Sequence, residues 1–78
     1  MKEFVATFFS HYAATRFAKK MSRHNLAFSL RPVPRSLSSS CGTCVVFEAE
    51  EPLMEGDVEE VEAIYEKVDG HYLERWRN

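Results

Sequence analysis

The sequence predicts an α+β domain with the ferredoxin-like split βαββαβ arrangement, in which a four-stranded antiparallel sheet carries two helices on one face. Two kinds of segment support this prediction: short segments whose apolar residues suit strands, and longer segments that repeat apolar residues at helical spacing. In chain order the predicted elements are strand 3–9, helix 10–24, strand 26–31, strand 44–49, helix 57–70 and strand 71–76. From their number, we expect the 78 residues to form a single domain, 1–78.

The first strand and the first helix have clear local signals. Glu3–Phe9 has apolar residues on both faces, which is typical of a central strand that is covered on both sides. Ser10 is a suitable N-cap for a helix that runs to about His24. Apolar residues recur at helical spacing along this helix and form one stripe: Ala13, Ala14, Phe17, Ala18 and Met21.

The next two strands flank a loop. Leu26–Arg31 alternates apolar and other residues, and Pro32 and Pro34 end it, because proline cannot donate a backbone hydrogen bond to a sheet. Cys44–Ala49 contains adjacent valines, which favour a strand.

The C-terminal third predicts a second helix and a last strand. Asp57 is a suitable N-cap, and Glu60 stands three residues later, as in a capping box. The apolar stripe of this helix consists of Val58, Val61, Ile64, Tyr65 and Val68. Gly70 would end it, and His71–Trp76 would form a short edge strand.

Right-handed crossovers fix the predicted strand order as 4-1-3-2. This order gathers Ser10, His11, the loop 32–44 and His71 at one end of the sheet. Because both predicted helices lie on one face, apolar residues on the other face need a cover. We therefore expect a homodimer through the open sheet face.

Charge and hydropathy narrow the class of protein. The net charge of −2 argues against nucleic acid as a partner. Basic residues gather in 16–35 and acidic residues in 48–66, which indicates two oppositely charged helix faces. No apolar run reaches the roughly 18 residues of a membrane span. Charges interrupt the start of the chain where a signal peptide is apolar, so we expect a cytoplasmic protein.

The loop 32–44, PVPRSLSSSCGTC, is the candidate site. Cys41 follows three serines and precedes Gly42, a setting that favours an exposed thiol over a buried one. Helix N-termini and nearby cations lower the pKa of a thiol and so favour the nucleophilic thiolate. His11, Arg35, the Ser40 hydroxyl and the peptide N–H at Gly42 could stabilise a sulfur or selenium anion there.

Other interpretations of the cysteines stay open. Cys41 and Cys44 form a C-x-x-C, which could be a redox dithiol if the chain turned at Gly42. Together with His11 and His71 they would supply four zinc ligands, but the histidines lack ligand-like spacing, so we predict no metal site. Either cysteine could also be a small buried residue of a strand.

The sequence resembles the selenium/sulfur-carrier-like family of small bacterial domains over roughly residues 3–70. The residues that carry the resemblance are Phe8-Phe9-Ser10 before an alanine-containing helix, Pro32-Val33-Pro34-Arg35, Ser38-Ser39-Ser40-Cys41-Gly42 and the aliphatic third strand. The resemblance implies that Cys41 holds a persulfide or perselenide and that sulfur- or selenium-donor and acceptor proteins are the partners. Members of the family usually have a small or aliphatic residue at the position of Cys44. Here Cys44 is either a strand residue or the thiol that resolves an oxidised Cys41.

Three functions from different classes therefore remain: a carrier, a Cys41/Cys44 redox unit, and a non-catalytic interaction module. A turnover enzyme fits less well, because the chain has no recognisable pair of catalytic carboxylates and no phosphate-binding glycine loop. We expect no cofactor.

Overall fold

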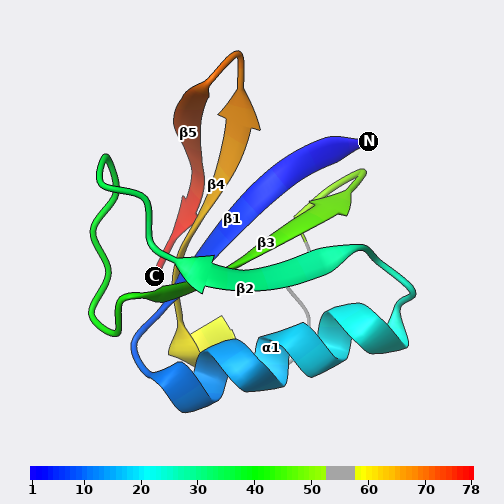
Figure 1. The fold of residues 1–78 in the computed structure, drawn as a ribbon, viewed down its shortest axis with the longest axis vertical. Helices are drawn as coiled ribbons and strands as arrows, with labels where there is room; N and C mark the ends of the chain where they lie inside the picture. The colour runs from blue at the N-terminus through cyan, green and yellow to red at the C-terminus, as the bar shows by residue number, and fades with distance from the viewer. Residues whose placement is uncertain (53–57) are drawn as a thin grey trace.

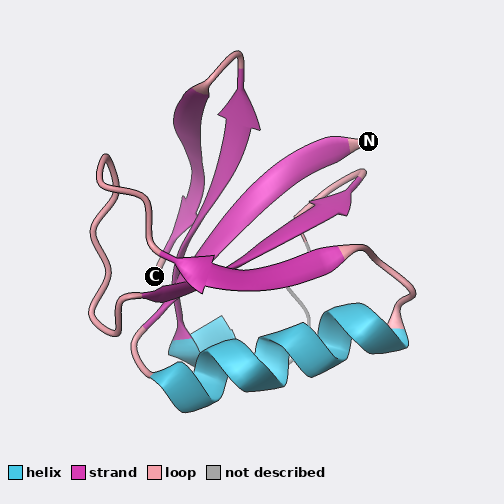
Figure 2. Ribbon diagram, viewed as in Figure 1, coloured by secondary structure: helices cyan, strands magenta, loops and turns pink. Residues whose placement is uncertain are grey.

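The computed structural model describes residues 1–52 and 58–78, which form one antiparallel sheet and one long helix (Figures 1 and 2). In chain order the elements are β1 Lys2–Phe8, α1 His11–Arg23, β2 Phe28–Pro32, β3 Thr43–Ala49, the 3-10 turn η1 Val58–Glu60, β4 Val61–Val68 and β5 His71–Arg77. The five strands lie in the order β2-β3-β1-β4-β5. The prediction of a ferredoxin-like sheet of four strands with two helices is therefore wrong.

The N-terminal half matches its sequence signals. The Ser10 hydroxyl caps α1 by accepting a hydrogen bond from the Ala13 N–H at 3.2 Å. The residues of the predicted helix stripe, Ala13, Ala14, Phe17, Ala18 and Met21, are all buried. β1 is central and pairs with β3, and β2 pairs with the far edge of β3, as the predicted order of these three strands requires. The other neighbour of β1 is β4, whereas the prediction placed strand 71–76 there.

The predicted helix 57–70 is a strand over Val61–Val68. Its N-cap, Asp57, lies outside the described residues. The segment fits a helical stripe because β4 is buried on both faces, so that Ala63, Ile64 and Tyr65 are buried in succession. Continuous burial removes the alternation that usually identifies a strand. The β-branched and aromatic residues of this segment favour a strand over a helix.

A two-residue turn reverses the chain after β4. Val68 pairs with His71, and both intervening residues have positive φ, 51° at Asp69 and 78° at Gly70. Asp-Gly is a strong signal for such a hairpin, because the turn requires left-handed backbone at both positions. The hairpin places His71 at the end of the sheet where β1 begins, so the predicted meeting of His71 with the loop 32–44 is wrong.

The main core lies between α1 and the sheet. Phe17 of α1 packs between Phe8 of β1 and Phe47 of β3, with ring centroids 5.2 and 5.4 Å apart. Phe8 and Phe47 are fully or almost fully buried, and each such side chain contributes about 1.5–3 kcal/mol through removal from water. These contacts hold the C-terminal end of β1, where the chain enters α1, against the helix.

Even in a single chain, the sheet face opposite α1 is largely buried. Its apolar residues Val5 and Tyr65 are only 1% and 7% exposed, and Cys44 and Ala63 are fully buried. The expected homodimer through this face needs exposed apolar residues, and these four residues do not supply them.

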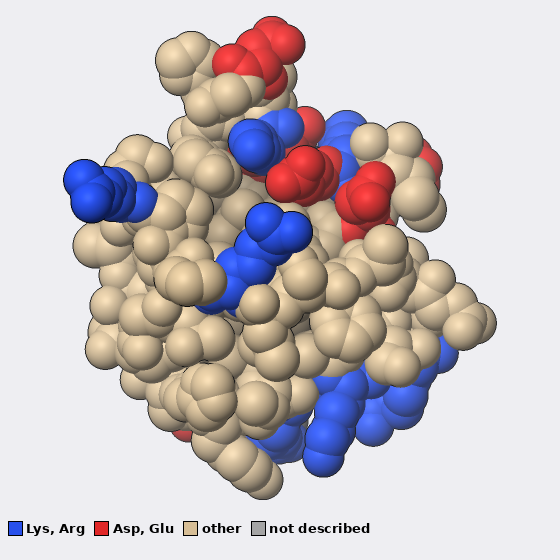
Figure 3. Space-filling view, viewed as in Figure 1, with Lys and Arg blue, Asp and Glu red and all other residues tan. Residues whose placement is uncertain are grey.

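The acidic residues are clustered more than the basic ones on the surface. Figure 3 shows one group of Lys and Arg along the edge formed by α1 and others over the rest of the face, whereas Asp and Glu lie mostly over the opposite end of the sheet. The basic surface is a helix face, as predicted. The predicted acidic helix face is wrong, because part of the acidic stretch belongs to β4. In the described chain, no helix combines the length and the apolar character that crossing a membrane requires.

Candidate functional site

The loop that connects β2 to β3 lies at the end of the sheet from which α1 starts (Figure 1). The Val33 N–H donates to the Gly42 carbonyl at 3.1 Å and closes the base of the loop. The Ser39 hydroxyl donates to the Phe8 carbonyl at 3.1 Å, which attaches the loop to the last residue of β1. The segment before Cys41 is thus fixed to the central strand.

Glu62 holds the same segment from β4. Its carboxylate accepts hydrogen bonds from the Ser40 N–H at 3.1 Å and from the Ser40 hydroxyl at 3.3 Å. The pairing of β1 with β4 shifts here, since Thr7 lies opposite Ala63 and Phe8 opposite Val61, which leaves Glu62 as an extra residue. Such bulges redirect a side chain, and this one aims Glu62 at the loop.

Cys41 follows directly after this attachment. Its side chain is half-buried and packs against the core cluster between the sheet and α1. The thiol donates to the Thr43 carbonyl at 3.4 Å. Gly42 has a φ of 75°, a left-handed conformation that glycine adopts without strain, so the chain turns sharply from the thiol into β3.

The start of α1 lies beside this turn. The Nδ1 atom of His11, the first residue of α1, is 3.3 Å from the Thr43 hydroxyl, and the two groups form a hydrogen bond. The first turn of α1 contains no acidic residue, so its positive dipole end is not neutralised by its own side chains. The structure therefore places His11 against Thr43, at the same end of the sheet as Gly42 and Cys41.

The two remaining predicted residues lie differently. Both polar hydrogens of Ser40 are directed to Glu62, so an anion on Cys41 would have to compete with a carboxylate for them. Arg35 is exposed in the loop and makes no hydrogen bond or ion pair within the described part of the chain. The structure does not join Arg35 to Cys41.

Cys44 is a residue of β3 in a different environment. It pairs with Thr7, is fully buried, and its thiol donates to the Pro32 carbonyl at 3.7 Å. Burial raises the pKa of the Cys44 thiol above its ordinary value of 9.0; the charge of Arg31 opposes this effect, and Cys41 adds to it. Cys44 is therefore a poor source of thiolate at neutral pH.

The two thiols lie on opposite sides of the sheet. Cys41 packs against the core on the side of α1, whereas Cys44 shares the other face with Thr7. Both are free. Within the described residues, no three His, Cys, Asp or Glu side chains group as a metal site would, and His71 is at the far end of the sheet.

Sequence reasoning missed Glu62 as a residue of this site. The predicted helix placed Glu62 on a solvent-facing helix surface, where it had no relation to the loop. The Asp69–Gly70 turn signal could have shown that residues 61–68 form a strand next to the hairpin. Even then, only the bulge determines that Glu62 reaches Ser40.

Comparison with known proteins identifies the family of the chain. The model of one protein family, described as "Putative Se/S carrier protein-like", matches residues 3–76. No curated protein and no solved structure matched the chain. Because the match spans nearly the whole chain and includes the Cys41 loop, the chain belongs to the selenium/sulfur-carrier-like family.

Proposed function

We propose that the protein carries a sulfane sulfur or selenium atom on Cys41. In the loading step, the Cys41 thiolate attacks the terminal sulfur of a donor persulfide. A sulfur–sulfur bond to Cys41 forms, the sulfur–sulfur bond of the donor breaks, and the donor thiolate leaves and takes up the proton. Delivery is the same exchange with an acceptor thiol, so neither step needs an oxidant or a reductant.

The observation that carries this proposal is the contrast between the two thiols. Cys41 is half-buried at the sheet edge in a turn that leaves it partly accessible. Cys44 is fully buried, and burial raises its pKa. Only one thiol is thus accessible to a partner, which supports a single-thiol carrier more than a dithiol that closes a disulfide across the sheet.

The neighbours of Cys41 have distinct roles in this scheme. Gly42 provides the left-handed turn that presents the thiol, and its peptide N–H could bind the anion of the loaded form. His11, beside the turn, supplies a hydrogen-bonding group and, when protonated, a positive charge. Glu62 and Ser40 hold the loop, and Arg35 could contact a donor or acceptor protein from the exposed side of the loop.

The test is transfer of sulfur from glutathione persulfide, followed by the intact mass of the protein. We expect a mass increase of one sulfur atom for the natural protein and for Cys44→Ala, and none for Cys41→Ser. Peptide mapping should place the added sulfur on Cys41, and an acceptor thiol added afterwards should remove it. The protein in urea provides the control for the reactivity of an unstructured cysteine.

Three results would contradict the proposal. The first is equal loading of Cys41→Ser and the natural protein, and the second is loading that is no faster in the folded than in the unfolded chain. The third is a loaded Cys41 that an acceptor thiol cannot unload. Reversible formation of a Cys41–Cys44 disulfide in place of the persulfide would favour the redox unit.

A further inference from the structure

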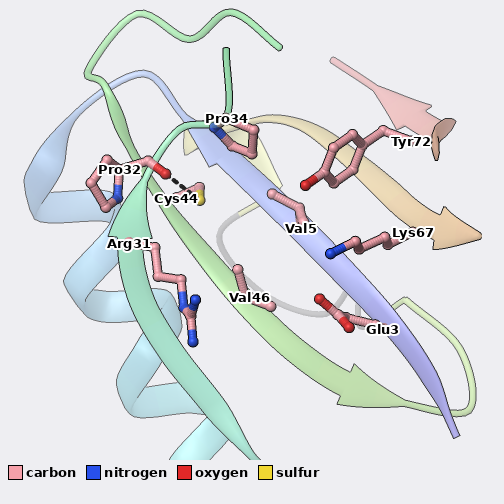
Figure 4. Close-up of a pocket in the computed structure, with 9 residues that line it drawn as sticks. All are labelled: Glu3, Val5, Arg31, Pro32, Pro34, Cys44, Val46, Lys67 and Tyr72. Atoms are coloured by element: carbon pink, nitrogen blue, oxygen red, sulfur yellow. Dashed lines mark hydrogen bonds between the residues drawn. The ribbon is translucent and has the colours of Figure 1, made fainter. Parts of the chain in front are cut away.

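A groove of about 360 Å3 lies on the sheet face opposite α1 (Figure 4). Its floor is apolar and consists mainly of Val5 from β1 and Val46 from β3, and Pro34 closes it on the side of the loop. Sites for small organic ligands have volumes of roughly 300–1,000 Å3 and largely apolar linings with a few polar groups. The groove is at the lower end of this range, which suits a ligand of few atoms.

Polar side chains border the apolar floor. Arg31 comes from β2, Lys67 from β4 and Tyr72 from β5. Figure 4 shows that the Tyr72 hydroxyl and the Lys67 ammonium point over the floor from the same side, while Arg31 borders the groove from the other. Three separate strands thus supply hydrogen-bond donors around one apolar surface.

Within the described residues, neither cation at the groove forms an ion pair. The Arg31 Nε donates to the neutral Ser29 hydroxyl at 3.0 Å. Glu3 stands opposite Lys67 in the pairing of β1 with β4, yet no ion pair joins them in the described chain. Two cations and one carboxylate leave a formal charge of +1 along the lining. The groove therefore favours a ligand with one negative charge.

We propose that this groove binds a small amphipathic organic monoanion, one carboxylate on a short apolar tail. The tail lies on the partly exposed Val46 and Pro34, above the buried Val5, and displaces water from their apolar surface. The carboxylate accepts charge-strengthened hydrogen bonds from Lys67 and Tyr72, and Arg31 adds positive charge from the other side of the groove. This binding activity is separate from sulfur transfer by Cys41 and does not depend on it.

The first experiment compares three ligands that share one tail. Octanoate, octan-1-ol and octylammonium are titrated into the full-length 15N-labelled protein, and amide chemical shifts are followed by NMR. We expect saturable shifts in β1, β3 and β4 around Val5, Val46 and Lys67, with octanoate binding most tightly and octylammonium most weakly. Equal binding of octanoate and octan-1-ol, or shifts confined to α1, would overturn the proposal.

Variants of the lining residues test its charge, because removing a cation and removing the carboxylate should change octanoate affinity in opposite directions. Lys67→Met and Arg31→Met should each weaken octanoate binding by about two- to fivefold, the size of a partly exposed charge contact. Glu3→Gln removes the only carboxylate among the described residues that line the groove and should strengthen binding by a similar factor. Lys19→Met, on the exposed face of α1, is the control for a general loss of positive charge. Weaker binding in Glu3→Gln, or an equal loss in Lys19→Met, would refute a specific anion site.

Discussion

Gly42 and Gly70 allow a test that separates backbone strain from function. Their φ angles are 75° and 78°, and an added Cβ at either position would meet no nearby heavy atom within 4 Å. Alanine at these positions therefore suffers only the cost of the left-handed conformation, about 1–2 kcal/mol. We expect Gly42→Ala and Gly70→Ala each to lower the free energy of unfolding by that amount. For a domain of this size, the midpoint temperature should fall by about 4–16 °C.

Circular dichroism during urea and thermal unfolding measures both effects. Asparagine tolerates left-handed backbone better than alanine, so Gly42→Asn and Gly70→Asn should each cost less than the alanine variant. Only the Gly42 variants should slow sulfur loading of Cys41, because Gly70 lies in the hairpin at the other end of the sheet. The reasoning fails if the alanine variants are as stable as the natural protein, or if Gly70→Ala slows loading as much as Gly42→Ala.

Three further expectations concern stability. Phe8→Ala should cost about 3–5 kcal/mol in urea unfolding because Phe8 is fully buried, whereas Phe9→Ala, at a side chain 45% exposed, should cost about 1 kcal/mol or less; similar losses would contradict the core described above. Ser10→Ala should cost about 1 kcal/mol by removing the cap of α1, and Ser22→Ala, inside the same helix, should not lower stability. Since burial raises the pKa of Cys44, its contribution to stability is complete below about pH 9 and is lost as the pH rises through the raised pKa. Unfolding at pH 7 and pH 10 should therefore show a smaller alkaline loss for Cys44→Ala than for the natural protein, and an equal loss would contradict this effect.

Local signals were sufficient where one face of an element is buried and a distinct residue begins or ends it. α1 has a one-sided stripe from Ala13 to Met21 and a serine cap, and the sequence placed it to within one residue at each end. β2 was found from alternation and from the prolines at its end, and β3 from its adjacent valines.

The same reasoning failed for β4 because this strand is buried on both faces. A run in which Ala63, Ile64 and Tyr65 are all buried satisfies a helical stripe as well as a strand. The error then moved His71 to the wrong end of the sheet and hid Glu62. Of the candidate site, Cys41, Gly42 and His11 could be placed from the topology, whereas the contact of Glu62 with Ser40 depends on a bulge that no local pattern shows.

The double attachment of Ser39 and Ser40 determines how partners could meet the thiol. Because Ser39 is bound to β1 and Ser40 to β4, the segment that carries Cys41 has lost most of the conformational freedom of a ten-residue loop, 33–42. A thiol held in this way does not swing out from one protein toward another. Donor and acceptor would have to dock at the same edge of the sheet in turn, so that a carrier built like this works by sequential encounters and one partner excludes the other.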